Sequence, residues 1–155
     1  MADMLVNLVL LPDLAPVLAG QKAKGVEIRR GQSEESHKIA EWIREQINPN
    51  WAIGCEVALE QEPSTCYIAV ETNGAADAQA ELSADAILGF ACFDVVKKGV
   101  FGPTGVRDDR ADSGIDTALL LVCLHEMAAL DYGQAAIGWS AYTDGGNKTD
   151  FGSGV

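Results

Sequence analysis

The sequence is poor in basic residues: 11 lysines and arginines stand against 23 aspartates and glutamates, for a formal net charge of -12. The acidic excess is spread along the chain rather than gathered in a tail. Such a field repels nucleic acid and anionic membrane, so neither is expected as a partner. It would attract a cationic amine, although acidity is also a common solubility device and does not by itself identify a substrate.

Paired cysteines and histidines at metal-ligand spacing are also missing. The four cysteines are far apart in the sequence, with no C-x-x-C pair and no neighbouring histidine at such a spacing. We therefore expect no metal site. Cys66, Cys92 and Cys123 each stand inside an apolar run, so buried free thiols in a reducing cytoplasm are the simplest interpretation.

A long apolar run is absent as well. The opening segment from Met4 to Leu18 is only partly apolar, because Asn7, Asp13 and two prolines interrupt it, and no basic residue precedes it. It predicts neither a signal peptide nor a membrane span. The expected location is the cytoplasm.

What the chain does contain is enough apolar material for a core. At 155 residues and 48% apolar content, it predicts one domain over 1–155. Within that domain we expect an irregular lead over 1–25, an exposed loop over 72–85 that is rich in Ala, Asp and Gly, and a Gly-rich tail over 140–155.

Apolar residues recur at spacings that predict both strands and helices. Strands are expected over 26–30, 65–71, 87–96, 100–106 and 135–139, helices over 33–48, 51–60 and 114–130, and, in the lead, a short strand over 5–11 and a short helix over 12–24. The run from Ile87 to Phe93 is too continuously apolar for a strand exposed on one side, so it should be central. From residue 26 on, the order is β-α-α-β-β-β-α-β. It predicts an α/β fold with a mixed, mostly antiparallel central sheet flanked by helices.

The segment from Phe101 to Leu121 is the most informative for chemistry. Its strand is interrupted by Gly102 to Gly105, a composition that indicates a bulge or splay exposing backbone groups. An Asp-rich turn then leads through Gly114 into a buried helix. Free N–H groups and the positive helix end form a site for an anion such as a pyrophosphate. Many helices begin after a glycine, so this feature alone leaves the ligand open.

The whole arrangement resembles the core of the GCN5-related N-acetyltransferase (GNAT) superfamily, whose fingerprint Arg/Gln-x-x-Gly-x-Gly/Ala lies between the fourth strand and the third helix. The stretch from Gly114 to Leu120 matches the end of that fingerprint, and the likeness covers roughly 26–139. It includes the strand at Ile87–Phe90 and Tyr132-Gly133 before the last strand. The resemblance implies an acyl-CoA N-acyltransferase fold, acetyl-CoA as co-substrate, and direct acyl transfer from the thioester to an amine.

The same resemblance implies a set of cofactor-binding residues. Backbone around Gly105 and Val106 would hold the pantetheine, and Ser113 to Asp116 would meet the pyrophosphate. The full set of expected cofactor-binding residues is Gly105, Val106, Arg110, Ser113, Gly114, Asp116 and Thr117.

Two departures from the family pattern stand out. The first fingerprint position falls on Ala111, with Arg110 one place away, and the last falls on Asp116, where a carboxylate would repel a pyrophosphate. Beyond Trp139, the family continues into a helix carrying a Tyr general acid and a further strand. Here the chain runs into its Gly-rich tail, so that last strand would be missing or supplied by another chain, which would make a homodimer.

Acyl transfer to an amine needs a base for the amine proton and an acid near the leaving sulfur. Tyr142 is the nearest hydroxyl to the place the resemblance implies for the acid, although a polar loop tyrosine usually only packs its ring. Glu56 could approach an amine, although an exposed helix carboxylate is the commoner explanation. His37 and His125 are more simply explained as ordinary helix residues.

Two functions follow from these observations. The first is an acetyl-CoA-dependent N-acetyltransferase acting on a small amine. The alternative is a catalytically inactive GNAT-fold binding or interaction protein that has lost acyl-CoA use, because a fold does not determine a function.

Overall fold

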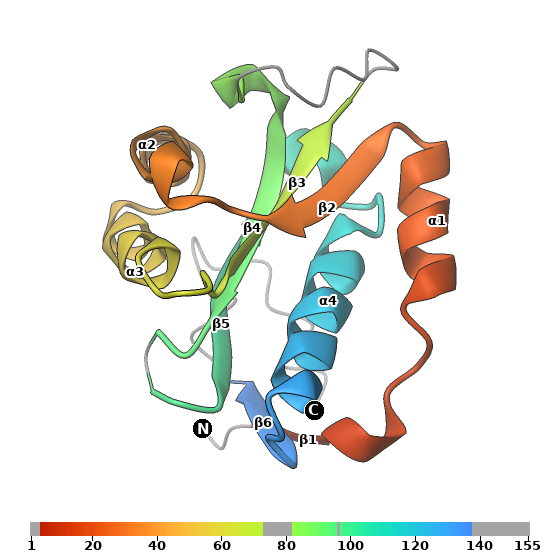
Figure 1. The fold of residues 1–155 in the computed structure, drawn as a ribbon. Helices are drawn as coiled ribbons and strands as arrows, with labels where there is room; N and C mark the ends of the chain where they lie inside the picture. Colours follow the sequence, from red (N-terminus) through yellow and green to blue (C-terminus); the bar gives the residue numbers. More distant parts are fainter. Residues whose placement is uncertain (1–3, 73–81, 96, 138–155) are drawn as a thin grey trace.

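The computed structural model describes residues 4–72, 82–95 and 97–137, which form a single six-stranded sheet with helices on both faces (Figure 1). The strands are β1 (Met4–Asn7), β2 (Val26–Arg30), β3 (Cys66–Glu71), β4 (Ile87–Phe93), β5 (Val100–Val106) and β6 (Gln134–Ile137). The helices are α1 (Ala15–Ala23), α2 (Ser36–Gln46), α3 (Pro49–Leu59) and α4 (Ile115–Ala129). None of these helices has the length and apolar character needed to span a bilayer.

The sheet has the order β1-β6-β5-β4-β3-β2. Every neighbouring pair is antiparallel except β5 and β6, which are parallel and are joined through α4. The predicted fold class, a mixed and mostly antiparallel sheet flanked by helices, is therefore confirmed. The predicted strand over 100–106 is found at those bounds, and β4 is buried along its whole length, as its continuous apolar run indicated.

The sheet separates two hydrophobic cores, because alternate strand residues face opposite sides. On one face, Ile39 and Ile43 of α2 and Ala52 and Leu59 of α3 pack against the sheet around Phe90. On the other face lies α4, with α1 beside it (Figure 1). The buried residues of α4 extend around most of the helix, which explains why its sequence shows an apolar run rather than a narrow stripe.

The N-terminal lead, expected to be irregular apart from a short strand over 5–11 and a short helix over 12–24, contributes β1 and α1 to this fold. β1 pairs with β6 from Met4 opposite Ile137 to Asn7 opposite Gln134. The edge of β6 that was expected to lack a partner is thus paired by the chain's own N-terminal segment. A homodimer stays a prediction.

Two of the segments expected to be irregular fall mainly outside the described residues. The tail over 140–155 lies outside them entirely, as does Trp139 at the end of the predicted last strand. Of the loop over 72–85, the described part includes Leu82, which is buried, and a short 3-10 turn at Ala84–Ala86 that leads into β4.

Candidate functional site

The candidate site begins at β5, the strand predicted to be splayed. On one side β5 pairs with β4, with Phe90 opposite Gly105 and Gly89 opposite Val106. On the other side, β6 pairs with it only at Val100 and Phe101. Residues 102–106 thus have an edge that no strand among the described residues pairs with. Residues 102–104 are buried, whereas Gly105 and Val106 are half-buried and lead into the turn before α4.

The faces of β5 near this edge are closely covered. A Cβ added to Gly105 would lie 2.9 Å from Cγ2 of Ile47, at the end of α2. A Cβ added to Gly89 would lie 3.0 Å from the carbonyl oxygen of Gly105 and 3.2 Å from Cδ1 of Leu119 on α4. Both glycines therefore allow neighbouring elements to pack directly on the β4–β5 backbone.

The turn from β5 into α4 is held by backbone and hydroxyl hydrogen bonds. The N–H of Arg107 donates to the carbonyl oxygen of Leu88 at 2.8 Å, which extends the β4–β5 ladder by one residue. The hydroxyl of Ser113 donates to the carbonyl oxygen of Arg110 at 2.6 Å. Gly114 has φ +84°, a left-handed conformation that favours glycine, and it precedes the first residue of α4. The start of α4 is exposed at Gly114 and Thr117, so its N–H groups and dipole face outward.

Both arginines of this turn form ion pairs within the protein. Arg107 makes a bidentate pair with Asp109, with Nε–Oδ1 at 2.7 Å and Nη2–Oδ2 at 3.0 Å. This pairing holds the pKa of the Asp109 carboxyl below its usual value. Nη2 of Arg110 lies 2.7 Å from Oε2 of Glu71, at the end of β3. The charge these cations could offer an anionic ligand is therefore already partly neutralised.

Acidic side chains are numerous where the pyrophosphate was predicted. Asp116 is exposed, and its Oδ1 accepts a hydrogen bond from the backbone N–H of Thr117 at 2.9 Å. One of the N–H groups at the helix start therefore already has an acceptor. Three more aspartates stand in the turn, at positions 108, 109 and 112. The backbone of the site thus suits an anion, whereas its side chains oppose one.

Gln21, a residue that the sequence did not single out, lies under the turn. It comes from α1, is 5% exposed, and its Nε2 donates to the carbonyl oxygen of Ser113 at 3.1 Å. Nζ of Lys24 donates to the same oxygen at 2.9 Å. Oε1 of Gln21 has no hydrogen-bond partner among the described residues. Nothing in the sequence indicates this contact, because 92 positions separate Gln21 from Ser113.

Of the two predicted catalytic residues, the structure describes only Glu56. Glu56 is half-buried on α3, on the sheet face opposite α4, and its carboxylate has no hydrogen bond or ion pair with another described residue. Tyr142 lies outside the described residues. The seven predicted cofactor residues lie along one segment, from the end of β5 through the turn to the start of α4.

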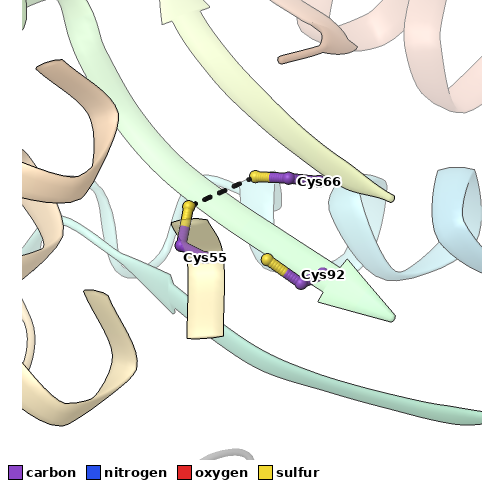
Figure 2. A group of neighbouring side chains, drawn as sticks. All are labelled: Cys55, Cys66 and Cys92. Carbon is purple, nitrogen blue, oxygen red and sulfur yellow. Dashed lines mark hydrogen bonds between the residues drawn. The ribbon is translucent and has the colours of Figure 1, made fainter. Parts of the chain in front are cut away.

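The cysteines, which are far apart in the sequence, are not far apart in the fold. Cys55 of α3, Cys66 of β3 and Cys92 of β4 are buried, and their sulfur atoms all lie within 4.8 Å of one another (Figure 2). No sequence pattern indicates this cluster, since it depends on the β3–β4 register and on where α3 crosses the sheet. Cys123 is on α4, in the core of the other face.

Comparisons with solved structures identify the fold. A GCN5-related N-acetyltransferase from Sphaerobacter thermophilus matches 96% of this chain with a TM-score of 0.65 at 17% identity. The GCN5-related glucosamine N-acetyltransferase region of a fungal multi-domain GH3 beta-N-acetylglucosaminidase matches 91% with a TM-score of 0.63 at 10% identity. A Drosophila protein matches 88% with a TM-score of 0.54 at 11% identity.

The chain spans 43%, 18% and 40% of these three solved chains, respectively. No protein-family model and no curated protein matches the sequence. At such low identities the likeness concerns the arrangement of the elements. The chain therefore has the fold of the GCN5-related N-acetyltransferases.

Proposed function

We propose that the chain binds acetyl-CoA along β5 and at the start of α4 and transfers the acetyl group to a small amine. The observation that carries this proposal is the half-buried edge at Gly105 and Val106, which no described strand pairs with and which the turn at 107–113 connects to the left-handed Gly114 and the exposed start of α4. Backbone groups of Gly105 and Val106 would pair with the amides of the pantetheine arm. The N–H groups near Ser113 and Gly114 would bind the pyrophosphate.

Acetyl-CoA would supply an acyl group activated as a thioester. The protein would have to accept a proton from the amine and provide one to the leaving sulfur. Glu56 is the candidate for the first role, since its carboxylate is half-buried and has no partner among the described residues. Tyr142 is the candidate for the second. The net charge of -12 favours the approach of a cationic amine.

A second function, a GNAT-fold binding protein that does not use acyl-CoA, is favoured by the charges at the start of α4. Each carboxylate beside a pyrophosphate costs about 1 kcal/mol in fully solvated surroundings and several times that in a drier site. Arg107 and Arg110, which could offset this cost, are bound to Asp109 and Glu71.

Isothermal titration of acetyl-CoA and of free CoA separates the two functions. The proteins compared are the wild type, Asp116→Ala and Asp116→Gly, since alanine and glycine are the residues of the family fingerprint at this position. Asp13→Ala is the matched control, because it removes one exposed carboxylate outside the site. Binding by the wild type supports the transferase, and binding only by the Asp116 variants supports the second function. No binding by any of the proteins would mean that the site is misplaced.

If the wild type binds acetyl-CoA, release of free CoA in the presence of a panel of small amines tests transfer. We expect Glu56→Gln to lower kcat by roughly 10²-fold or more while leaving the affinity for acetyl-CoA unchanged. Glu60→Gln is the control, because Glu60 is an exposed carboxylate just after the same helix. Equal kcat in the wild type and Glu56→Gln would exclude Glu56 as the base.

A further inference from the structure

The buried cysteine cluster lies on the α2–α3 face of the sheet, away from α4. Figure 2 shows the three side chains pointing toward one another from α3, β3 and β4. The sulfur atoms of Cys55 and Cys66 are 3.7 Å apart, and all three sulfur atoms lie within 4.8 Å of one another. All three residues have 0% exposure.

The sheet fixes two of the three sulfur positions. Cys66 and Cys92 are directly opposite each other on β3 and β4. The N–H of Phe93 donates to Thr65, whereas the carbonyl oxygen of Cys66 accepts from Gly31 on the other side of the strand. Cys66 and Cys92 are therefore a non-hydrogen-bonded pair, the closer kind, with Cα atoms about 4.5 Å apart. Cys55 lies on α3, and its sulfur is within 4.8 Å of the sulfurs of this pair.

These distances are close to those that a metal ion requires. Three thiolate sulfurs bound in a plane at about 2.3 Å from a metal lie about 4.0 Å from one another. The sulfur atoms of Cys55 and Cys66 are 3.7 Å apart, and no two sulfurs of the cluster are more than 4.8 Å apart. Side-chain adjustments of less than about 1 Å would therefore bring all three sulfurs to a common centre.

The ligand set selects among metals. An all-sulfur site suits soft ions such as Cu(I) and Zn²⁺, but structural zinc sites are almost always four-coordinate. All four cysteines and both histidines of the sequence are among the described residues, and Cys123 lies in the core of the opposite face. His37 is exposed, and His125 hydrogen-bonds the carbonyl oxygen of Pro12. No fourth thiol or imidazole is therefore within reach.

From this geometry we propose that Cys55, Cys66 and Cys92 form a three-sulfur site for a soft monovalent cation of the Cu(I) class. Binding forms three metal–sulfur bonds and breaks the S–H bonds of those thiols that are still protonated, and the released protons go to solvent. Copper and sulfur keep their oxidation states. A bound ion would tie α3 to β3 and β4, and it would stabilise the folded chain because the unfolded chain lacks the assembled site.

Anaerobic titration of the reduced protein with Cu(I), against a chromogenic Cu(I) chelator, tests this proposal. We expect one equivalent to bind the wild type, with proton release and a rise in Tm. Cys92→Ala and Cys66→Ala should weaken binding at least about tenfold. Cys123→Ala is the matched control, because it removes an equally buried thiol outside the cluster and should bind as the wild type does. No binding by the wild type, or equal binding by Cys92→Ala, would overturn the proposal.

Two further measurements on the wild type keep the test independent of how the variants fold. X-ray absorption at the copper edge should show three sulfur neighbours at about 2.3 Å and no nitrogen or oxygen neighbour. Zn²⁺ at the same concentration should not displace Cu(I) from the protein. A site with two sulfurs, or one in which Zn²⁺ displaces Cu(I), contradicts three-sulfur coordination of a monovalent ion.

Discussion

Nη2 of Arg110 lies 2.7 Å from Oε2 of Glu71, and this ion pair joins the turn before α4 to the end of β3. The pair is partly exposed, with 26% and 28% of the two side chains accessible. It therefore contributes little to stability, but it keeps the cation of Arg110 away from a ligand at the helix start.

Removing the carboxylate of Glu71 should therefore improve anion binding. We expect Glu71→Gln to lower the Kd for CoA about fivefold, which corresponds to about 1 kcal/mol. Isothermal titration at low and at physiological salt measures the effect, which should shrink at the higher salt because the charges are near the surface. Glu34→Gln removes the same charge from an exposed position outside the site and is the control. An unchanged or higher Kd in Glu71→Gln would show that Arg110 does not contribute to ligand binding.

The contact between Gly105 and Ile47 gives a prediction about stability. A Cβ at Gly105 would lie 2.9, 3.1 and 3.3 Å from three atoms of Ile47, so alanine would overpack this contact. Gly105→Ala should lower the free energy of unfolding by about 1–3 kcal/mol, as measured by urea denaturation. In the double variant with Ile47→Val, part of that loss should be recovered, giving a coupling energy of at least about 0.5 kcal/mol. If the losses in the free energy of unfolding from the two single substitutions simply add in the double variant, the two residues do not interact.

The local elements of this fold could be predicted from the sequence because their signals are local. The continuous apolar run of β4, the Gly-Pro interruption of β5 and the glycine before α4 each determine the conformation of a few adjacent residues. The role of the N-terminal lead was less evident, since a four-residue edge strand is too short to show an alternating pattern.

Contacts between distant segments were not predictable, because they depend on strand register and helix placement. Cys66 meets Cys92 because these two positions are opposite in the β3–β4 ladder, and a shift of one residue would point one of them to the other face. The contact of Gln21 with Ser113 likewise depends on how α1 packs beside α4. The sequence thus predicted the backbone of the candidate site but not the side chains that lie beneath and beside it.

Gln21 gives a second prediction about stability, because the nitrogen of its buried amide has a hydrogen-bond partner and the oxygen has none among the described residues. Oε1 lacks a partner among the described residues, whereas Nε2 makes one hydrogen bond to Ser113, whose carbonyl oxygen also accepts from Lys24. A buried unpaired acceptor costs about 1–3 kcal/mol, while a typical hydrogen bond contributes about 1 kcal/mol. Gln21→Met, which keeps the side-chain length, should leave the free energy of unfolding unchanged or raise it by up to about 1 kcal/mol. A loss of more than about 1 kcal/mol in urea denaturation would mean that Oε1 has a partner.

The Arg29–Glu35 pair gives a pH-dependent prediction. Nη2 of Arg29 lies 2.7 Å from Oε2 of Glu35, and Oε1 of Glu35 accepts a second bond from Nη1 at 3.0 Å. Burial opposes the ionised carboxyl, but the hydrogen bonds from Arg29 and from the backbone N–H of Gln32, together with the charges of Arg29 and Lys38, outweigh it and lower the pKa of Glu35. Because the folded-state pKa is below the unfolded one, the pair stabilises the protein above the usual carboxyl pKa of about 4.3, and this contribution is lost as the pH falls through the lowered folded-state value.

Glu35→Gln should therefore be less stable than the wild type by about 1 kcal/mol at neutral pH. Urea denaturation at a series of pH values should show the difference shrinking below about pH 4, since both proteins then carry a neutral group at position 35. Glu34→Gln is the matched control, because Glu34 is an exposed carboxylate in the same turn and should cost less than about 0.5 kcal/mol at any pH. A difference for Glu35→Gln that stays constant into the acidic range would assign the loss to packing or capping rather than to the ion pair with Arg29.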